Sequence, residues 1–196
     1  MARTCSLSLA LAGSLAVSAA SARAQNPDSS AQALAQVSAW LTSTLPKVGT
    51  FSVNVTGDWA NAGAFRSTAG SNRSVEARHQ IREVTFENCE LRYRSDFQFR
   101  GAVSEPFSWN VVLPLAVMDL ASTRVQQYVL PSGLRATNSR SEAYVRAVAT
   151  STGFTVTDRE RRTISVWEHS IPVARSENAD EVLEVLGRAA RLCGAQ

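Results

Sequence analysis

The stretch "ENCELRYRSDFQFR", Glu87–Arg100, decides the fold because its residues alternate between two kinds. Successive side chains of a β-strand point to opposite faces of the sheet, so this alternation predicts a strand with one buried and one solvated face. Such strands are typical of antiparallel sheets. One set of alternate positions is apolar and the other is polar: Cys89, Leu91, Tyr93, Phe97 and Phe99 against Glu90, Arg92, Arg94, Asp96, Gln98 and Arg100.

Strand-like segments continue on both sides of this stretch. Residues 80–86, "QIREVTF", join it at Glu87–Asn88, where the tolerance of asparagine for positive φ favours a two-residue hairpin turn. A bulge in one long strand is the alternative. The other candidates are separated by short pieces rich in turn residues, which makes seven or eight strands in all. They are residues 50–56, 107–113, 124–130, 142–149, 153–157 and 162–173.

Two amphipathic helices flank the strands. Residues 29–46 place apolar side chains at helical spacing before Pro46, and a second apolar stripe runs from Val182 to Cys193 before Gly194. The order helix, strands, helix predicts an α+β fold. We expect a strongly bent antiparallel sheet or open barrel of seven to eight strands. The C-terminal helix should pack across it, and the N-terminal helix against an edge or outer face.

The first residues have the layout of a secretory signal peptide. A basic start, an apolar run and the small-residue exit "ARA" predict a signal peptide over residues 1–24 and a single α+β domain over residues 25–196. The expected location is therefore secreted or periplasmic. Cleavage would lower the net charge from +3 to about +1, with both signs interspersed, so no nucleic-acid partner is expected. No membrane span is expected either, because Pro114 interrupts the longest later apolar run.

Cleavage at this point would leave two cysteines in an oxidising compartment. Cys89 occupies the apolar parity of its strand, and Cys193 lies on the apolar stripe of the last helix. A helix docked over the sheet would bring them together, so we predict a Cys89–Cys193 disulfide. The alternative is a reactive thiol, which needs nearby cations or a helix N-terminus. Cys193 lies instead at a helix C-terminus.

No motif in the sequence predicts catalysis, a metal site or a cofactor. The two histidines, His79 and His169, belong to no metal-ligand spacing, and there is no GxSxG motif. His169 has the opposite parity from Ile164 and Val166, which predicts an exposed or edge position. The aspartates in turn-like settings are explained by turn formation: Asp58, Asp119 and Asp158.

Two features could bind a ligand. The triplet "GDW", Gly57–Trp59, resembles the GxW element near the first strand of lipocalins, which implies a small secreted barrel that carries hydrophobic ligands. The element order also resembles that of pleckstrin-homology-like domains. The second feature is the apolar segment "LPLAVMDLAS", residues 113–122, which could line an opening of the sheet or form an apolar patch. The candidate ligand-binding residues are Trp59, Trp109, Leu115 and Met118.

These features predict a non-enzymatic binding module for an apolar small molecule, a lipid or a protein partner. One alternative is an enzyme whose active site is assembled from scattered strand residues. A cleft in which His79 or His169 meets a carboxylate and a hydroxyl would favour that class. Another alternative is a structural component of the cell envelope, which a large apolar patch and a co-purifying partner would favour.

Overall fold

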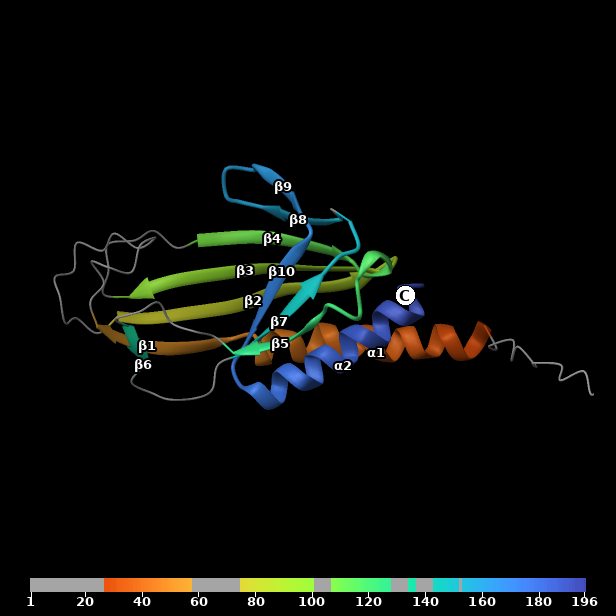
Figure 1. Cartoon of the computed structure of the whole chain (residues 1–196), viewed down its shortest axis with the longest axis horizontal. Helices are drawn as coiled ribbons and strands as arrows, with labels where there is room; N and C mark the ends of the chain where they lie inside the picture. The colour runs from red at the N-terminus through yellow and green to blue at the C-terminus, as the bar shows by residue number, and fades with distance from the viewer. Residues whose placement is uncertain (1–26, 58–74, 101–106, 128–133, 137–142, 152) are drawn as a thin grey trace, which may run out of the picture.

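The computed structural model of the chain describes residues 27–57, 75–100, 107–127, 134–136, 143–151 and 153–196, and the predicted signal peptide lies outside them. The fold is α+β with antiparallel strands between two helices, as the sequence predicts (Figure 1). The helices are α1 (Pro27–Val48) and α2 (Ser176–Leu192), with a short 3-10 helix, η2 (Leu115–Val117). The strands are β1 (Phe51–Gly57), β2 (Val75–Glu87), β3 (Glu90–Arg100), β4 (Phe107–Pro114), β5 (Arg124–Gln127), β6 (Leu134–Ala136), β7 (Ala143–Val148), β8 (Phe154–Thr157), β9 (Thr163–Val166) and β10 (Glu168–Val173).

The strands form two sheets instead of the single sheet expected. The long sheet has the order β6-β1-β2-β3-β4-β8-β9, and a smaller sheet has the order β10-β7-β5. The segment 162–173, expected as one strand, divides at a bend at Trp167 into β9 and β10, which belong to different sheets. The long sheet does not close into a barrel, since β6 and β9 are its two edges.

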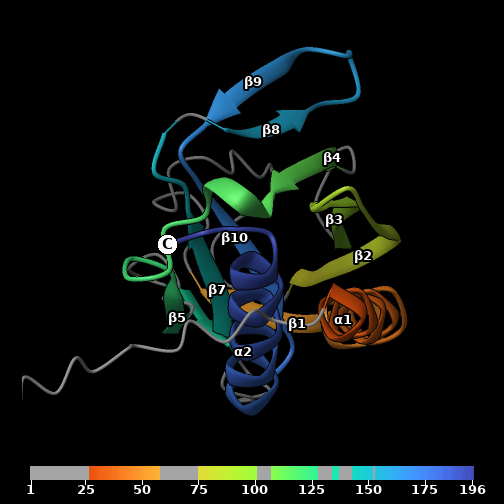
Figure 2. The same ribbon diagram turned by 90° about the vertical axis from the view of Figure 1, so that its right-hand side faces the viewer.

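The core is made of side chains from both sheets and both helices, whose arrangement is seen in Figure 2. Alternate residues of β3 supply it, among them Leu91 and Tyr93, and α2 supplies Val182 and Leu186 from its apolar stripe. These side chains are removed from water, which is the main source of stability in a fold of this size. The polar parity of β3 faces the opposite side of the sheet, as the alternation predicts.

Helix α1 packs on the inner side of the long sheet, so the expectation of an edge or outer-face position is wrong. Its stripe of Leu41 and Leu45 is fully buried in the same core as Ile81 of β2. Helices α1 and α2 also contact each other, and Trp40 donates a hydrogen bond from Nε1 to Oε1 of Glu181 at 3.1 Å. Both helices therefore cover one end of the long sheet, and β1–β4 extend beyond them (Figure 1).

The predicted disulfide is present and joins the β2–β3 turn to the end of α2. Cys89 and Cys193 are 104 residues apart in sequence, with a Cα–Cα distance of 5.7 Å. Cys89 lies in the hairpin turn with Asn88, at φ values of 61° and 50°, and not within a strand as its parity suggested. Paired positive φ values are those of the tight turns that match the twist of a hairpin. The turn thus places Cys89 beside the last residues of the helix.

Candidate functional site

The residues predicted to bind an apolar ligand do not gather around one opening in the described part of the chain. Trp59 lies outside the described residues. Leu115 and Met118 are core residues with exposed fractions of 0% and 1%. Trp109 is half-buried on β4, where its ring stacks on Phe107 with centroids 5.9 Å apart.

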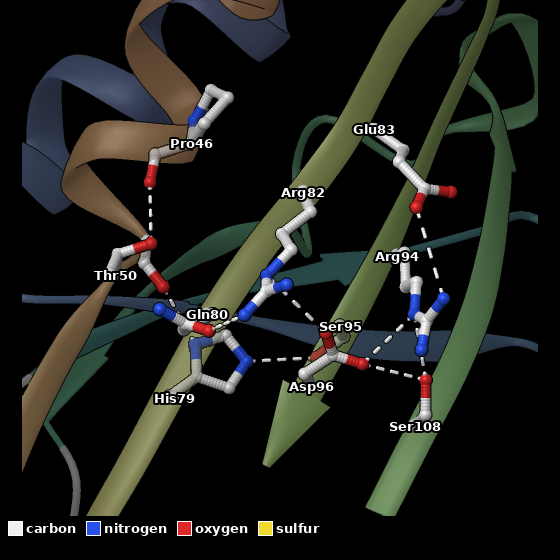
Figure 3. A network of polar contacts seen from close by, with 11 residues as sticks. Pro46, Thr50, His79, Gln80, Arg82, Glu83, Arg94, Ser95, Asp96 and Ser108 are labelled. Carbon is white, nitrogen blue, oxygen red and sulfur yellow. Dashed lines mark hydrogen bonds and ion pairs between the residues drawn. The ribbon is translucent and has the colours of Figure 1, made fainter.

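Polar side chains instead form two clusters on the opposite faces of β2 and β3 (Figure 3). The inner pair consists of His79 and Ser95, whose Nε2 and Oγ atoms are 2.8 Å apart. Nδ1 of His79 is 2.8 Å from the carbonyl oxygen of Gly49, the residue after α1. A carbonyl oxygen only accepts, so Nδ1 carries the proton and Nε2 of the neutral ring accepts from the Ser95 hydroxyl.

Close packing of α1 against β2 produces this contact. Gly49 is buried, and a Cβ atom added there would lie 2.4 Å from Cδ1 of Ile81. Only glycine therefore lets the end of the helix approach the strand closely enough for its carbonyl to reach His79. The sequence did not reveal the role of His79, because its partner Gly49 is 30 residues away in the chain.

Burial keeps the imidazole of His79 neutral. It lowers the pKa from 6.5 to about 4, and the hydrogen bond to Gly49 opposes this shift only in part. A neutral histidine beside a serine hydroxyl could act as a general base. However, His79 and Ser95 are 2% and 6% exposed, so a substrate has no access to them. The pair therefore serves the packing of the inner face.

His169 faces inward on β10, an edge strand of the smaller sheet, so of the two expected positions, exposed or edge, the edge position is confirmed. Its ring lies 6.0 Å from that of Tyr93, and His169 shares a strand face with Ile171 and Val173, both buried. Burial lowers its pKa from 6.5 to about 4, and the neighbouring His79 acts in the same direction. The reason is that Ile164 does not mark a buried face: it is 59% exposed on β9, whereas the buried residues of β10 have the parity of His169. The Tyr93 hydroxyl is buried and has no hydrogen-bond partner among the described residues, and its pKa is raised by burial.

The outer cluster is charged and centres on Asp96. Its Oδ1 atom accepts hydrogen bonds from Nε of Arg94 at 3.0 Å and from Oγ of Ser108 at 2.7 Å. Its Oδ2 atom lies 3.5 Å from Nε of Arg82. Partial burial disfavours the carboxylate, but these hydrogen bonds and the charges of Arg94 and Arg82 outweigh it and lower the pKa. Asp96 is therefore ionised at neutral pH and holds two guanidinium groups in place.

A hollow of about 150 Å³ adjoins this cluster on the outer face of the long sheet. We call it the arginine hollow, because four arginines line it with a single acidic residue. Arg159 reaches it from the turn between β8 and β9, and the other lining residues belong to β2 and β3. The lining residues are Arg78, Gln80, Arg82, Arg94, Asp96, Phe97, Gln98 and Arg159.

The four guanidinium groups differ in what they contact. Arg82 and Arg94 are paired with Asp96, whereas Arg78 and Arg159 take part in no ion pair within the described part of the chain. Two arginines without an ion pair that line one hollow favour a negatively charged group there, since each guanidinium presents several donors in a fixed plane. The sequence did not indicate this site because Arg159 comes from a turn some 60 residues beyond Arg94.

The structure and the comparisons with known proteins give no support for a metal site, a membrane-spanning helix or a known family within the described residues. The residues that the structure describes contain no group of three or more side chains that could hold a metal ion. None of the helices described is long and apolar enough to cross a membrane. Comparisons with protein-family models, curated proteins and solved structures gave no significant match to this chain. The arginine hollow is therefore the candidate site that the geometry itself supports.

Proposed function

We propose that this protein is a secreted or periplasmic, non-enzymatic binding module that holds an anionic group in the arginine hollow. The observation that carries the proposal is that Arg78 and Arg159, from β2 and the β8–β9 turn, line one hollow, in which the only acid among the described residues is already paired. Charge-assisted hydrogen bonds from arginine to carboxylate or phosphate are about twice as strong as neutral ones. The Cys89–Cys193 disulfide is compatible with an oxidising location.

The proposal keeps the class of function that the sequence predicts and changes the ligand. An apolar ligand gains no support from Leu115 and Met118, because both are already covered by the core. An enzymatic reaction gains none from His79, because its nearest polar neighbours are a hydroxyl and a backbone carbonyl inside the protein. The outer face, in contrast, offers charged side chains that water and solutes can reach.

Titration of the isotopically labelled protein with inorganic pyrophosphate, followed by NMR, tests the proposal. We expect saturable shifts confined to β2, β3 and the β8–β9 turn, which weaken as salt is added because the charges are partly exposed. The double variant Arg78→Ala/Arg159→Ala should bind at least about tenfold more weakly, since it loses two charge-assisted hydrogen bonds. The matched control is Arg124→Ala/Arg188→Ala, which removes the same charge from exposed positions on β5 and α2. Equal weakening of the two double variants, or shifts spread over the surface, would contradict a specific site.

A further inference from the structure

Asp96 is an unexpected residue in an anion-binding hollow. A carboxylate repels an incoming anion, and it also neutralises part of the charge of Arg82 and Arg94. Alignment of these arginines does not by itself require an acid, since polar side chains hold guanidinium groups as well. The presence of Asp96 therefore points to a ligand that has a use for a hydrogen-bond acceptor.

One oxygen of Asp96 has capacity to accept such a bond. Oδ1 already accepts from two donors, at 3.0 Å and 2.7 Å. Within the described part of the chain, the one polar contact of Oδ2 is the 3.5 Å ion pair with Arg82, which is longer than an ordinary hydrogen bond. An ionised carboxylate oxygen accepts two hydrogen bonds, so Oδ2 can receive a hydroxyl group from a ligand.

Two amide side chains extend the same pattern. Gln80 accepts from Arg82 through Oε1, which leaves its amino group as a donor. Gln98 also lines the hollow, and no hydrogen bond or ion pair is found for it within the described part of the chain. Amides both donate and accept, as hydroxyl groups do. The lining therefore combines unpaired cations with acceptors and amides, and this combination matches a ligand that carries an anionic group and several hydroxyls.

We propose that the arginine hollow binds an acidic saccharide, with its carboxylate on Arg78 and Arg159 and a ring hydroxyl donating to Oδ2 of Asp96. This inference rests on the proposed function, because it names the ligand class of the same site. The hollow is smaller than pockets that enclose drug-sized ligands, so it would hold one sugar unit. Asp96 is then a specificity residue, which selects hydroxylated anions over simple ones.

Three small ligands of similar ring size separate the contributions of charge and hydroxyls: methyl glucuronide, cyclohexanecarboxylate and methyl glucoside. We expect methyl glucuronide to bind the wild-type protein at least about tenfold more tightly than either of the other two, since one ligand alone offers both groups. NMR titration is suited to the weak binding of single sugar units. Equal affinity for the two carboxylates would overturn the inference without the need for any variant.

The variant Asp96→Asn tests the assigned acceptor. It should reduce the preference for methyl glucuronide over cyclohexanecarboxylate to about threefold or less, while simple anions bind as well as before or better, because a negative charge is removed. The matched control is Glu87→Gln, an exposed acid at the end of the neighbouring strand β2, which should keep the preference. Equal weakening of both carboxylates by Asp96→Asn would contradict the role of Asp96.

The same titrations distinguish failure of the inference from failure of the proposed function. Binding of pyrophosphate without any preference for methyl glucuronide would leave an anion-binding module and overturn the saccharide. Absence of binding by all probes, pyrophosphate included, would overturn both.

Discussion

The inner and outer faces of β2 and β3 carry two polar clusters built from neighbouring residues of the same strands. His79 and Ser95 point inward, whereas Gln80 and Asp96, one residue further along each strand, point outward (Figure 3). The inner cluster is neutral, and each imidazole nitrogen has one fixed partner. The outer cluster is ionic, and its side chains share several partners in contact with water.

This difference shows how one alternating sequence supports two roles. A buried polar group must keep its hydrogen bonds, because loss of a partner costs the full desolvation energy of the group. Exposed ion pairs contribute little to folding, since water and salt screen them. We therefore expect changes to the inner face to alter stability, and changes to the outer face to alter binding.

The largest effect is expected from the disulfide, which ties the turn between these strands to the helix behind the inner face. The double variant Cys89→Ala/Cys193→Ala should lose roughly 4 to 5 kcal/mol of unfolding free energy, because the bond closes a loop of about a hundred residues. Urea unfolding of the oxidised wild type and the double variant measures the loss. If the comparison of faces holds, the folded variant should still bind pyrophosphate within about twofold of wild type. A loss below about 1 kcal/mol would show that α2 docks without the covalent tie.

The next effect compares the two faces directly. His79→Ala should destabilise the protein by roughly 3 to 5 kcal/mol, since it leaves a cavity and removes the partner of both Gly49 and Ser95. The matched control, Arg82→Ala, lies three residues further along β2 with its side chain on the outer face, and it should change stability by no more than ~0.5 kcal/mol. Urea unfolding at pH 7 measures both. Similar losses for the two variants would remove the distinction between the faces.

The alternation of apolar and polar residues predicted the outline of this arrangement. It identified the buried face of β3 and the polar face opposite, because the side-chain period of a strand is fixed by geometry. Together with the cysteine count it also predicted the Cys89–Cys193 disulfide, although the turn position of Cys89 depends on backbone dihedrals that parity does not encode.

The contacts that join distant segments could not be predicted in the same way. The His79–Gly49 contact depends on how closely α1 approaches β2, and the arginine hollow depends on where the β8–β9 turn places Arg159. The bend at Trp167 divides the expected strand between two sheets, and Ile164 on the first part is exposed, so it does not mark the buried face that His169 shares. Each of these is a tertiary effect, whereas periodicity reports only on the local segment.

The smallest expected effect is a difference between the two faces in how they make the stability of the protein depend on pH. Burial lowers the pKa of His79 to about 4, so the unfolded chain binds the proton more tightly than the folded one. This part of the stability is fully present above pH 6.5 and is lost as the pH falls toward 4, by about 3 kcal/mol for a shift of this size. His169 acts in the same window.

Asp96, on the outer face, acts in a lower pH window, since its lowered pKa means that its contribution to stability is lost only below about pH 4. We therefore expect His79→Gln to reduce the slope of the stability profile between pH 6.5 and 4, with the remaining slope due to His169, and Asp96→Asn to leave that interval unchanged. Urea midpoints measured across this range check both, and a slope that Asp96→Asn flattened instead would assign the acid sensitivity to the outer face.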